Sequence, residues 1–296
     1  MILINGVRSP RSGLFSDHFM IISKIQTARP LGLAVLLFMT SFLIGCSQRG
    51  LFEQPRDQAV RVAAEKGWAQ RRYSGGDFSL LTFSSPNIKS TEPLNVYIEG
   101  DGFAWLDRYT PAKDPSPRNL VSLSLALKNQ GSAVYLARPC QFLSPQERAD
   151  CSAVFWTSAR YSKEVVASLN AVIEQIKTEQ GSTRIRLYGY SGGGVVAALL
   201  AMRRLDVIEL ITYGAPLDTR AWTALHGLSP LRYSLNPADN MRALRSVPQT
   251  HYVGEKDQNV PPALLYDFVE RLNAGERATV RAKVIEIKGA DHVCCW

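Results

Sequence analysis

One stretch in the middle of the chain decides the fold: Arg184–Arg204, which reads RIRLYGYSGGGVVAALLAMRR. It begins with a short apolar run, Ile185–Tyr188, typical of a buried strand, and it ends in an Ala/Leu-rich run typical of a helix. The two are joined by Gly189–Gly193, a G-x-S-x-G pattern in which the chain must turn sharply. Small residues are needed beside the turn because larger side chains would collide with the strand and the helix. The pattern predicts that Ser191 holds its hydroxyl exposed at the apex; the alternative is a serine that only caps the helix.

The same alternation of strand and helix extends over most of the chain. Further apolar, β-rich runs are Phe78–Phe83, Leu94–Ile98, Ala133–Ala137, Val207–Tyr213, Thr250–Val253 and Val280–Ile287. Helical segments separate most of them, and in the clearest one, Tyr161–Thr178, apolar residues recur on one face. Short apolar strands that alternate with helices predict an α/β fold, with a mostly parallel central sheet and helices on both of its faces. We expect one domain over residues 68–296, preceded by a tether and an N-terminal helix over residues 46–67.

Composition excludes several classes of protein. The chain has 296 residues, 46% hydrophobic and 20% charged, which is a globular balance rather than a disordered one. The net charge of +8 is not gathered into a dense basic run, so a nucleic-acid partner is not expected. No CxxC or histidine-rich spacing predicts a metal site, and neither glycine-rich phosphate-binding pattern occurs, so no cofactor is expected.

The N-terminal region carries the pattern of an export signal. Leu31–Ile44, LGLAVLLFMTSFLI, is uncharged and almost wholly apolar, and Lys24 and Arg29 precede it. The run is shorter than the ~20 residues that a spanning helix needs. This favours a signal peptide over residues 1–45, more typical in form if it starts at Met20; a short uncleaved membrane anchor is the alternative.

The signal ends in Leu43–Cys46, LIGC, which resembles a bacterial lipoprotein box. The resemblance implies cleavage before Cys46 and attachment of lipid, palmitate among its acyl chains, to the thiol. By the same analogy, Ser47 after the cysteine favours transfer to the outer membrane. We therefore expect a lipid-anchored envelope protein that faces the periplasm.

The remaining cysteines agree with an oxidising compartment, because Cys140, Cys151, Cys294 and Cys295 are an even number. Cys140 and Cys151 are 11 positions apart in a loop-like stretch and are the expected pair. A bond between the adjacent Cys294 and Cys295 would close a strained ring and is disfavoured.

A serine hydroxyl is a poor nucleophile until a neighbouring base takes its proton, and histidine is the usual base. His292 follows the last predicted strand, at the carboxyl edge where ligands bind to parallel sheets, and is the predicted base. His251 lies inside a strand-like run, where a structural role is the default. His226 ends a predicted helix and would line a pocket or face solvent.

The histidine in turn needs a carboxylate that fixes its tautomer. Asp257 follows the next-to-last strand and is the favoured acid, because the order Ser…Asp…His with the acid there is the usual arrangement. Asp218 follows the strand before and is the alternative acid. Each could also have a purely structural role: Asp257 as a turn aspartate and Asp218 as the N-cap of a helix.

With Ser191, Asp257 and His292 assigned, residues 68–296 resemble the α/β-hydrolase superfamily. More narrowly, the chain resembles bacterial α/β-hydrolase lipoproteins that combine a lipoprotein box, an RPCQ-type segment (here Arg138–Gln141) and a GYSGGG turn. The resemblance implies a serine hydrolase of the carboxylesterase type, which acts on a small ester, thioester or amide substrate through an acyl-enzyme. The alternatives are a catalytically idle lipoprotein that binds an envelope partner or ligand, and an acyltransferase or peptidase with the same three residues.

Two backbone amides are expected to hold the oxyanion of such a reaction. The first is that of Gly192, at the start of the helix that follows the serine. The superfamily implies a second donor after an early strand, where Asp101-Gly102-Phe103 replaces the common His-Gly-x, so the Phe103 N–H is the candidate. An acidic Asp101 would repel an oxyanion unless it points away or is neutralised. The interval Thr219–Pro248, where superfamily members insert a lid, is too short for a large cap.

Overall fold

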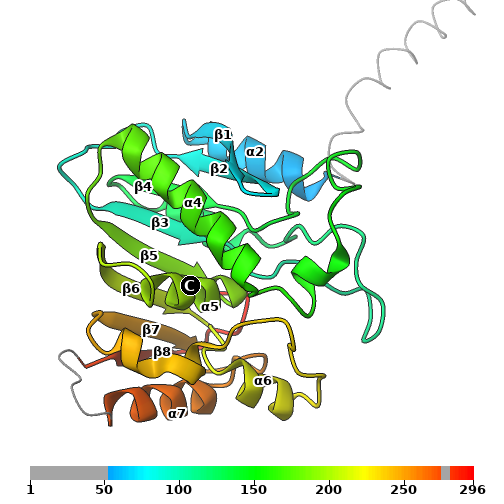
Figure 1. Cartoon of the computed structure of the whole chain (residues 1–296), viewed down its shortest axis with the longest axis vertical. Coiled ribbons are helices and arrows are strands. Elements are labelled where there is room, and N and C mark those ends of the chain that lie inside the picture. Colours follow the sequence, from blue (N-terminus) through cyan, green and yellow to red (C-terminus); the bar gives the residue numbers. More distant parts are fainter. Residues whose placement is uncertain (1–52, 275–280) are drawn as a thin grey trace, which may run out of the picture. The chain divides into compact units, whose positions relative to one another are not determined.

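A central β-sheet of eight strands organises the molecule (Figure 1). The computed structural model describes residues 53–274 and 281–296, so the predicted signal peptide, the lipidation site Cys46 and most of the tether lie outside the described residues. The strands are β1 (Ala69–Gly75), β2 (Phe78–Ser84), β3 (Leu94–Ile98), β4 (Ala133–Leu136), β5 (Ile185–Tyr190), β6 (Val207–Tyr213), β7 (Gln249–Gly254) and β8 (Lys283–Ile287). Their spatial order is β1-β2-β4-β3-β5-β6-β7-β8.

The helices alternate with the strands along the chain, as predicted. They are α2 (Pro55–Glu65), α3 (Val121–Leu127), α4 (Lys163–Gln180), α5 (Gly192–Ala201), α6 (Thr219–Leu225) and α7 (Pro262–Asn273), with short 3₁₀ turns η1 (Ala153–Trp156) and η2 (Pro237–Leu244). Local chemistry sets the ends of α4: the Ser162 hydroxyl accepts the Val165 N–H at its start, and Gly181 ends it with a φ of 65°. None of the helices in the described part of the chain has both the length and the apolar character to cross a membrane.

Strand direction places the chemistry at one edge of the sheet. β4, β3, β5, β6, β7 and β8 run parallel to one another, whereas β2 is antiparallel to both β4 and the edge strand β1. The carboxyl ends of the six parallel strands therefore meet at a common edge, which is where ligands bind to such sheets. The predicted fold class, a mostly parallel sheet with helices on both faces, is confirmed.

Alternate side chains of the strands enter two different cores. In β3, Val96 belongs to a core that includes residues of α4, α5 and α7, and its neighbour Tyr97 belongs to the core under α2 and α3. Figure 1 shows α4 and α5 lying over the same face of the sheet. Because both faces are covered, the central strands are mostly apolar, which explains why they could be predicted from the sequence.

The two disulfides test the cysteine assignments. Cys140 and Cys151 are bonded, with Cα atoms 5.9 Å apart, as predicted. Cys294 and Cys295 are also bonded to one another, so the prediction that disfavoured this pair is wrong. The adjacent thiols meet where the backbone at Cys295 takes a φ of 78°, a conformation open to this tail because it belongs to no helix or strand.

Candidate active site

Ser191 stands at the tight turn between β5 and α5. Its φ of 50° is uncommon for a residue other than glycine and marks a backbone held in place by its surroundings. A Cβ on Gly189 would lie 2.4 Å from the carbonyl oxygen of Gly193, and one on Gly193 would lie 2.3 Å from that of Ile98. The glycines on both sides of the serine are therefore required by close backbone packing.

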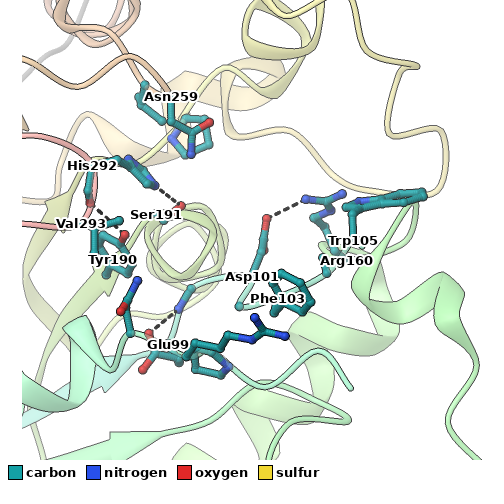
Figure 2. Close-up of a pocket in the computed structure, with 18 of the residues that line it drawn as sticks. Glu99, Asp101, Phe103, Trp105, Arg160, Tyr190, Ser191, Asn259, His292 and Val293 are labelled. Carbon is teal, nitrogen blue, oxygen red and sulfur yellow. Dashed lines mark hydrogen bonds and ion pairs between the residues drawn. The ribbon is translucent and has the colours of Figure 1, made fainter. Parts of the chain in front are cut away.

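His292 and Asp257 complete a hydrogen-bonded chain with this serine. His292 Nε2 lies 3.0 Å from Ser191 Oγ, and His292 Nδ1 lies 2.8 Å from Asp257 Oδ2. In Figure 2 the imidazole of His292 points at the hydroxyl of Ser191. Because a carboxylate accepts hydrogen bonds, the Nδ1–H donates to Asp257 and leaves Nε2 to accept the serine proton. The structure thus brings together the three residues that the sequence analysis assigned to one site.

The environment of Asp257 fixes its carboxylate. Its side chain is fully buried, and Oδ1 accepts the backbone N–H groups of Asn259 and Val260 at 2.9 and 2.8 Å. These are the hydrogen bonds of an aspartate that stabilises a turn, so Asp257 has this structural role in addition to its contact with His292. With one oxygen held by the turn, only the other faces the histidine.

Asp218, the alternative acid, is engaged elsewhere. Its side chain accepts the N–H groups of Arg220 and Ala221 as the N-cap of α6, and it pairs with Arg271 at 2.8 Å. No hydrogen bond or ion pair joins Asp218 to His292 in the described residues. The structure therefore places Asp257, and not Asp218, beside the histidine.

The two other histidines of the described residues, His226 and His251, also have partners of their own. His251 is buried in β7 with its Nδ1 2.8 Å from Thr212 Oγ1, and burial lowers its pKa to about 3. The imidazole is therefore neutral and structural, as predicted. His226 Nε2 lies 2.7 Å from the carbonyl oxygen of Asn259 and donates to it.

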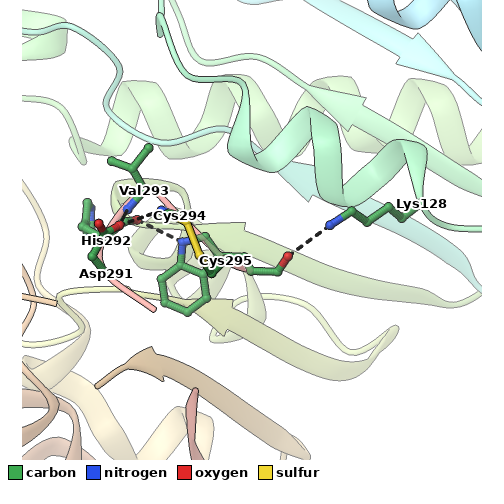
Figure 3. The surroundings of a disulfide bond; sticks show 7 residues. Lys128, Asp291, His292, Val293, Cys294 and Cys295 are labelled. Atoms are coloured by element: carbon green, nitrogen blue, oxygen red, sulfur yellow. Dashed lines mark hydrogen bonds between the residues drawn. A yellow bond between two sulfur atoms is a disulfide. The ribbon is translucent and has the colours of Figure 1, made fainter. Parts of the chain in front are cut away.

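The loop that carries His292 is tied down at several points. The Tyr190 hydroxyl and the Trp296 indole N–H both donate to the His292 carbonyl oxygen, at 2.8 and 3.0 Å. Asp291 accepts two backbone N–H groups of the following turn, at 2.8 and 2.7 Å. Figure 3 shows this turn, the disulfide that follows it, and the bond from Lys128 to the Trp296 carbonyl oxygen. Sequence reasoning missed Tyr190, although it lies next to the serine.

Of the two predicted oxyanion donors, the N–H of Gly192 is available and the N–H of Phe103 is not. Gly192 is the first residue of α5, whose initial N–H groups have no carbonyl of their own helix to bind, so its amide fits the prediction. The N–H of Phe103 donates instead to the carbonyl oxygen of Pro115 at 3.1 Å. The loop turns just before Phe103, at Gly102, which has a φ of 69°. The structure therefore contradicts the assignment of Phe103 as second donor.

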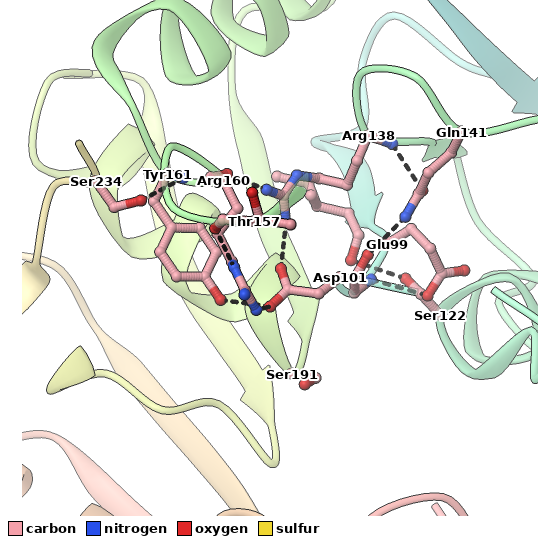
Figure 4. A network of polar contacts seen from close by, with 12 residues as sticks. Glu99, Asp101, Ser122, Arg138, Gln141, Thr157, Arg160, Tyr161, Ser191 and Ser234 are labelled. Carbon is pink, nitrogen blue, oxygen red and sulfur yellow. Dashed lines mark hydrogen bonds and ion pairs between the residues drawn. The ribbon is translucent and has the colours of Figure 1, made fainter. Parts of the chain in front are cut away.

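Asp101 lies at the centre of a buried charge network (Figure 4). Its Oδ1 accepts a hydrogen bond from Arg138 at 3.2 Å, and its Oδ2 accepts bonds from Arg160 and the Tyr161 hydroxyl at 2.8 and 2.7 Å. Burial alone would raise the pKa of Asp101, but the charges of Arg160 and Arg138 hold the pKa below its ordinary value. The two guanidinium groups outweigh the charge of the one carboxylate, so the group of three is positive and Asp101 does not repel an oxyanion.

The RPCQ segment builds this network from the end of β4. Arg138 is 5% exposed and takes part in the pair with Asp101. Gln141 accepts the Arg138 N–H at 3.0 Å and donates to the Gly100 carbonyl oxygen at 2.9 Å, which ties the segment to the loop after β3. Cys140 anchors it through the disulfide to Cys151. An arginine directly after a buried strand was a signal that sequence reasoning could have used.

A cavity of about 570 Å³ opens beside Ser191 and His292. Aromatic side chains on its wall are those of Phe103, Trp105, Tyr190 and Trp222. In Figure 2, Trp105 and Arg160 lie across the cavity from His292. Trp222 belongs to α6, in the interval where a lid was considered; that interval holds α6 and η2 but no large cap.

Glu99 lies beneath the cavity and is fully buried. Its carboxyl group accepts the Gly100 N–H and the Tyr135 hydroxyl, both at 2.9 Å. Burial raises the pKa of Glu99 to about 7, which favours its uncharged form.

The comparisons with known proteins bear on the fold. No family model matches the chain, and neither does any curated protein. Among solved structures, an esterase from Pyrococcus furiosus is similar over 83% of this chain and 90% of its own, with 14% identity and a TM-score of 0.55. A candidate dienelactone hydrolase from Klebsiella pneumoniae matches over 76% and 87%, with 18% identity and a TM-score of 0.52. A protein of unknown function from Agrobacterium tumefaciens, described as a candidate alpha/beta hydrolase, matches over 76% and 87%, with 13% identity and a TM-score of 0.50.

At these identities the likeness concerns the fold alone. It agrees with the strand order, the helices on both faces of the sheet and the sharp turn that presents Ser191. The chain accordingly has the α/β-hydrolase fold.

Proposed function

We propose that the chain is a serine hydrolase that cleaves a carboxylic ester, or a thioester or amide, through a covalent acyl-enzyme. The observation that carries the proposal is the hydrogen-bonded chain from Asp257 through His292 to the Ser191 hydroxyl. It supplies a nucleophile, a base within reach of the proton, and a carboxylate that orients the base. A cap serine would need none of these partners.

The chemistry proceeds in two halves. Ser191 Oγ attacks the carbonyl carbon while His292 Nε2 takes the hydroxyl proton, and the same proton then passes to the leaving group as the bond to it breaks. Water then attacks the acyl-enzyme carbonyl and gives its proton to His292, which passes that proton to Ser191 Oγ as the acyl–oxygen bond breaks and the acid is released. The N–H of Gly192 stabilises the oxyanion in both halves, and one such donor is worth about 3 kcal/mol in the transition state.

The buried network around Asp101 supports the same site from below. A Cβ on Gly192 would lie 2.0 Å from Asp101 Oδ1, so this carboxylate packs directly against the residue that supplies the oxyanion donor. Arg138 and Arg160 give the cluster a net positive charge, which favours an oxyanion nearby. Esters are the first substrate class to test, because an ester is the most readily cleaved of the three by an activated serine.

A panel of matched p-nitrophenyl esters, thioesters and anilides tests the proposal. We expect turnover of at least the esters, with a burst of p-nitrophenol equal to the enzyme when deacylation is slower than acylation. Ser191→Ala is the matched control and should remove all turnover above background. Equal rates for Ser191→Ala and the wild type would refute the assignment.

The anchoring to the envelope is part of the proposal and is supported by the sequence alone. The signal-like residues 1–45 and the lipoprotein box at Cys46 favour a protein held by lipid at the outer membrane and facing the periplasm. Cys46→Ser should move the protein from the membrane to the soluble fraction of the envelope. Retention of the Cys46→Ser protein in membranes would favour an uncleaved anchor instead.

A further inference from the structure

Arg118 lies on the wall of the same cavity as Ser191. It is exposed, and among residues 53–274 and 281–296 it makes no ion pair or side-chain hydrogen bond. Arg160, the other arginine on the cavity wall, is paired with Asp101. Arg118 is therefore a cation at the cavity that no carboxylate of the described residues pairs with.

An aromatic ring holds Arg118 in position. The centre of its guanidinium lies 3.9 Å from the centroid of the Phe103 ring, which also lines the cavity. Stacking on a ring face is favourable and leaves the N–H groups at the edge of the guanidinium unused. Those groups form a planar fork that matches the two oxygens of a carboxylate or phosphate.

The two acidic residues of the cavity wall do not offset this charge. Asp101 already serves Arg138 and Arg160, so that group of three carries a net charge of +1. Glu99 is fully buried, and its oxygens accept bonds from Gly100 and Tyr135. The surface that a substrate meets beside Ser191 is therefore positively charged and partly aromatic.

We propose that the substrate of Ser191 carries an anionic group, a carboxylate or a phosphate, and that Arg118 binds this group at the cavity wall. The inference deepens the proposed serine-hydrolase function and rests on it. In this account Arg118 is a specificity-determining residue: it selects the substrate and positions it, and it takes no part in the proton transfers. Trp105 and Trp222 provide the apolar wall for the remainder of the substrate.

Three p-nitrophenyl esters of similar length test the proposal: the monoester of glutaric acid, its neutral methyl ester, and the ester of 4-phosphooxybutyric acid. We expect kcat/KM for the better anionic ester to exceed that for the neutral one by about 10- to 100-fold, the range for a charge-assisted hydrogen bond. The two anionic arms distinguish a carboxylate from a phosphate. The preference should weaken as salt is added, because Arg118 is exposed.

Arg118→Gln should abolish the preference by raising KM for the anionic esters far more than KM for the neutral ester. The matched control is Arg184→Gln, which removes an exposed arginine at the opposite end of β5 and should retain the preference. Equal kcat/KM for charged and neutral esters in the wild type, or an equal loss on all three in Arg118→Gln, would overturn the proposal. Labelling of Ser191 by a neutral fluorophosphonate distinguishes failure of this proposal from failure of the serine-hydrolase function. If Ser191 is labelled but the esters show no preference for an anionic group, only the role of Arg118 is refuted. If Ser191 is not labelled, the serine-hydrolase function is refuted as well.

Discussion

Replacement of Asp257 by asparagine distinguishes between the two candidate acids of the site. In the wild type Oδ1 of Asp257 accepts two backbone N–H groups, and Oδ2 accepts the Nδ1–H of His292. The asparagine oxygen must stay on the backbone side, because an NH₂ group there would face two donors. Its NH₂ group then faces His292 Nδ1, which has to become an acceptor, and the imidazole proton moves to Nε2.

That tautomer cannot take the proton of Ser191. The expected loss in kcat is on the order of 10⁴-fold, the size known for the same wrong-tautomer effect in a serine protease. A loss of that size corresponds to about 5.4 kcal/mol in the barrier. The fold should survive, since the asparagine oxygen keeps both backbone bonds.

The assay is kcat for the best ester, with circular dichroism and thermal unfolding as checks of folding. Asp218→Asn is the control: asparagine caps a helix as well as aspartate does, and the lost pair with the half-exposed Arg271 is worth at most about 1 kcal/mol. We expect kcat of Asp218→Asn within about 2-fold of the wild type. A larger loss for Asp218→Asn than for Asp257→Asn would refute the reasoning and reassign the acid.

Three further predictions concern the surroundings of the site. Glu99→Gln should remove a pH dependence of stability: burial raises the pKa of Glu99 from 4.5 to about 7, so the folded wild type holds a proton that the unfolded chain releases. The bound proton stabilises the fold fully below pH 4.5, and this stabilisation is lost as the pH rises through 7. From pH 5 to pH 8, the free energy of unfolding measured in urea should fall by roughly 3 kcal/mol more in the wild type than in Glu99→Gln. An equal fall in both proteins would contradict this. Gly192→Ala should lower kcat on the order of 10²-fold, because the new methyl group would lie 2.0 Å from Asp101 Oδ1 and displace the oxyanion donor. Steady-state kinetics on the folded variant measure this loss, and an unchanged kcat would contradict the role of the Gly192 amide as oxyanion donor. Replacement of both Cys294 and Cys295 by serine should lower kcat about 10-fold, because it loosens the tail that holds the loop of His292. Kinetics identical to those of the wild type would show that the tail does not position this loop.

Much of the fold could be predicted because the central strands are buried on both faces. Runs such as Leu94–Ile98 and Val207–Tyr213 are mostly apolar, and the structure has strands with the same bounds. Strand β1, Ala69–Gly75, was not predicted, since it lies at the antiparallel edge of the sheet. Its sequence AQRRYSG is mostly polar and exposed, and only pairing with β2 makes it a strand.

The site divides in a similar way. Ser191, Asp257 and His292 each follow a predicted strand, so strand order alone indicated that they converge at one edge. The partners of Asp101 could not be inferred, because Arg138 and Arg160 come from loops whose paths no local pattern specifies. The direction of the Phe103 amide depends in the same way on one loop packing against another.

The central claim is that Ser191 is a nucleophile activated by His292. It is tested most directly by incubation of the purified protein with a neutral fluorophosphonate, followed by digestion and mass spectrometry of the peptide that contains Ser191. The account predicts one adduct, on the Ser191 hydroxyl, that is absent from Ser191→Ala and forms far more slowly in His292→Asn. An unlabelled wild-type protein, or an adduct that persists in Ser191→Ala, would contradict it.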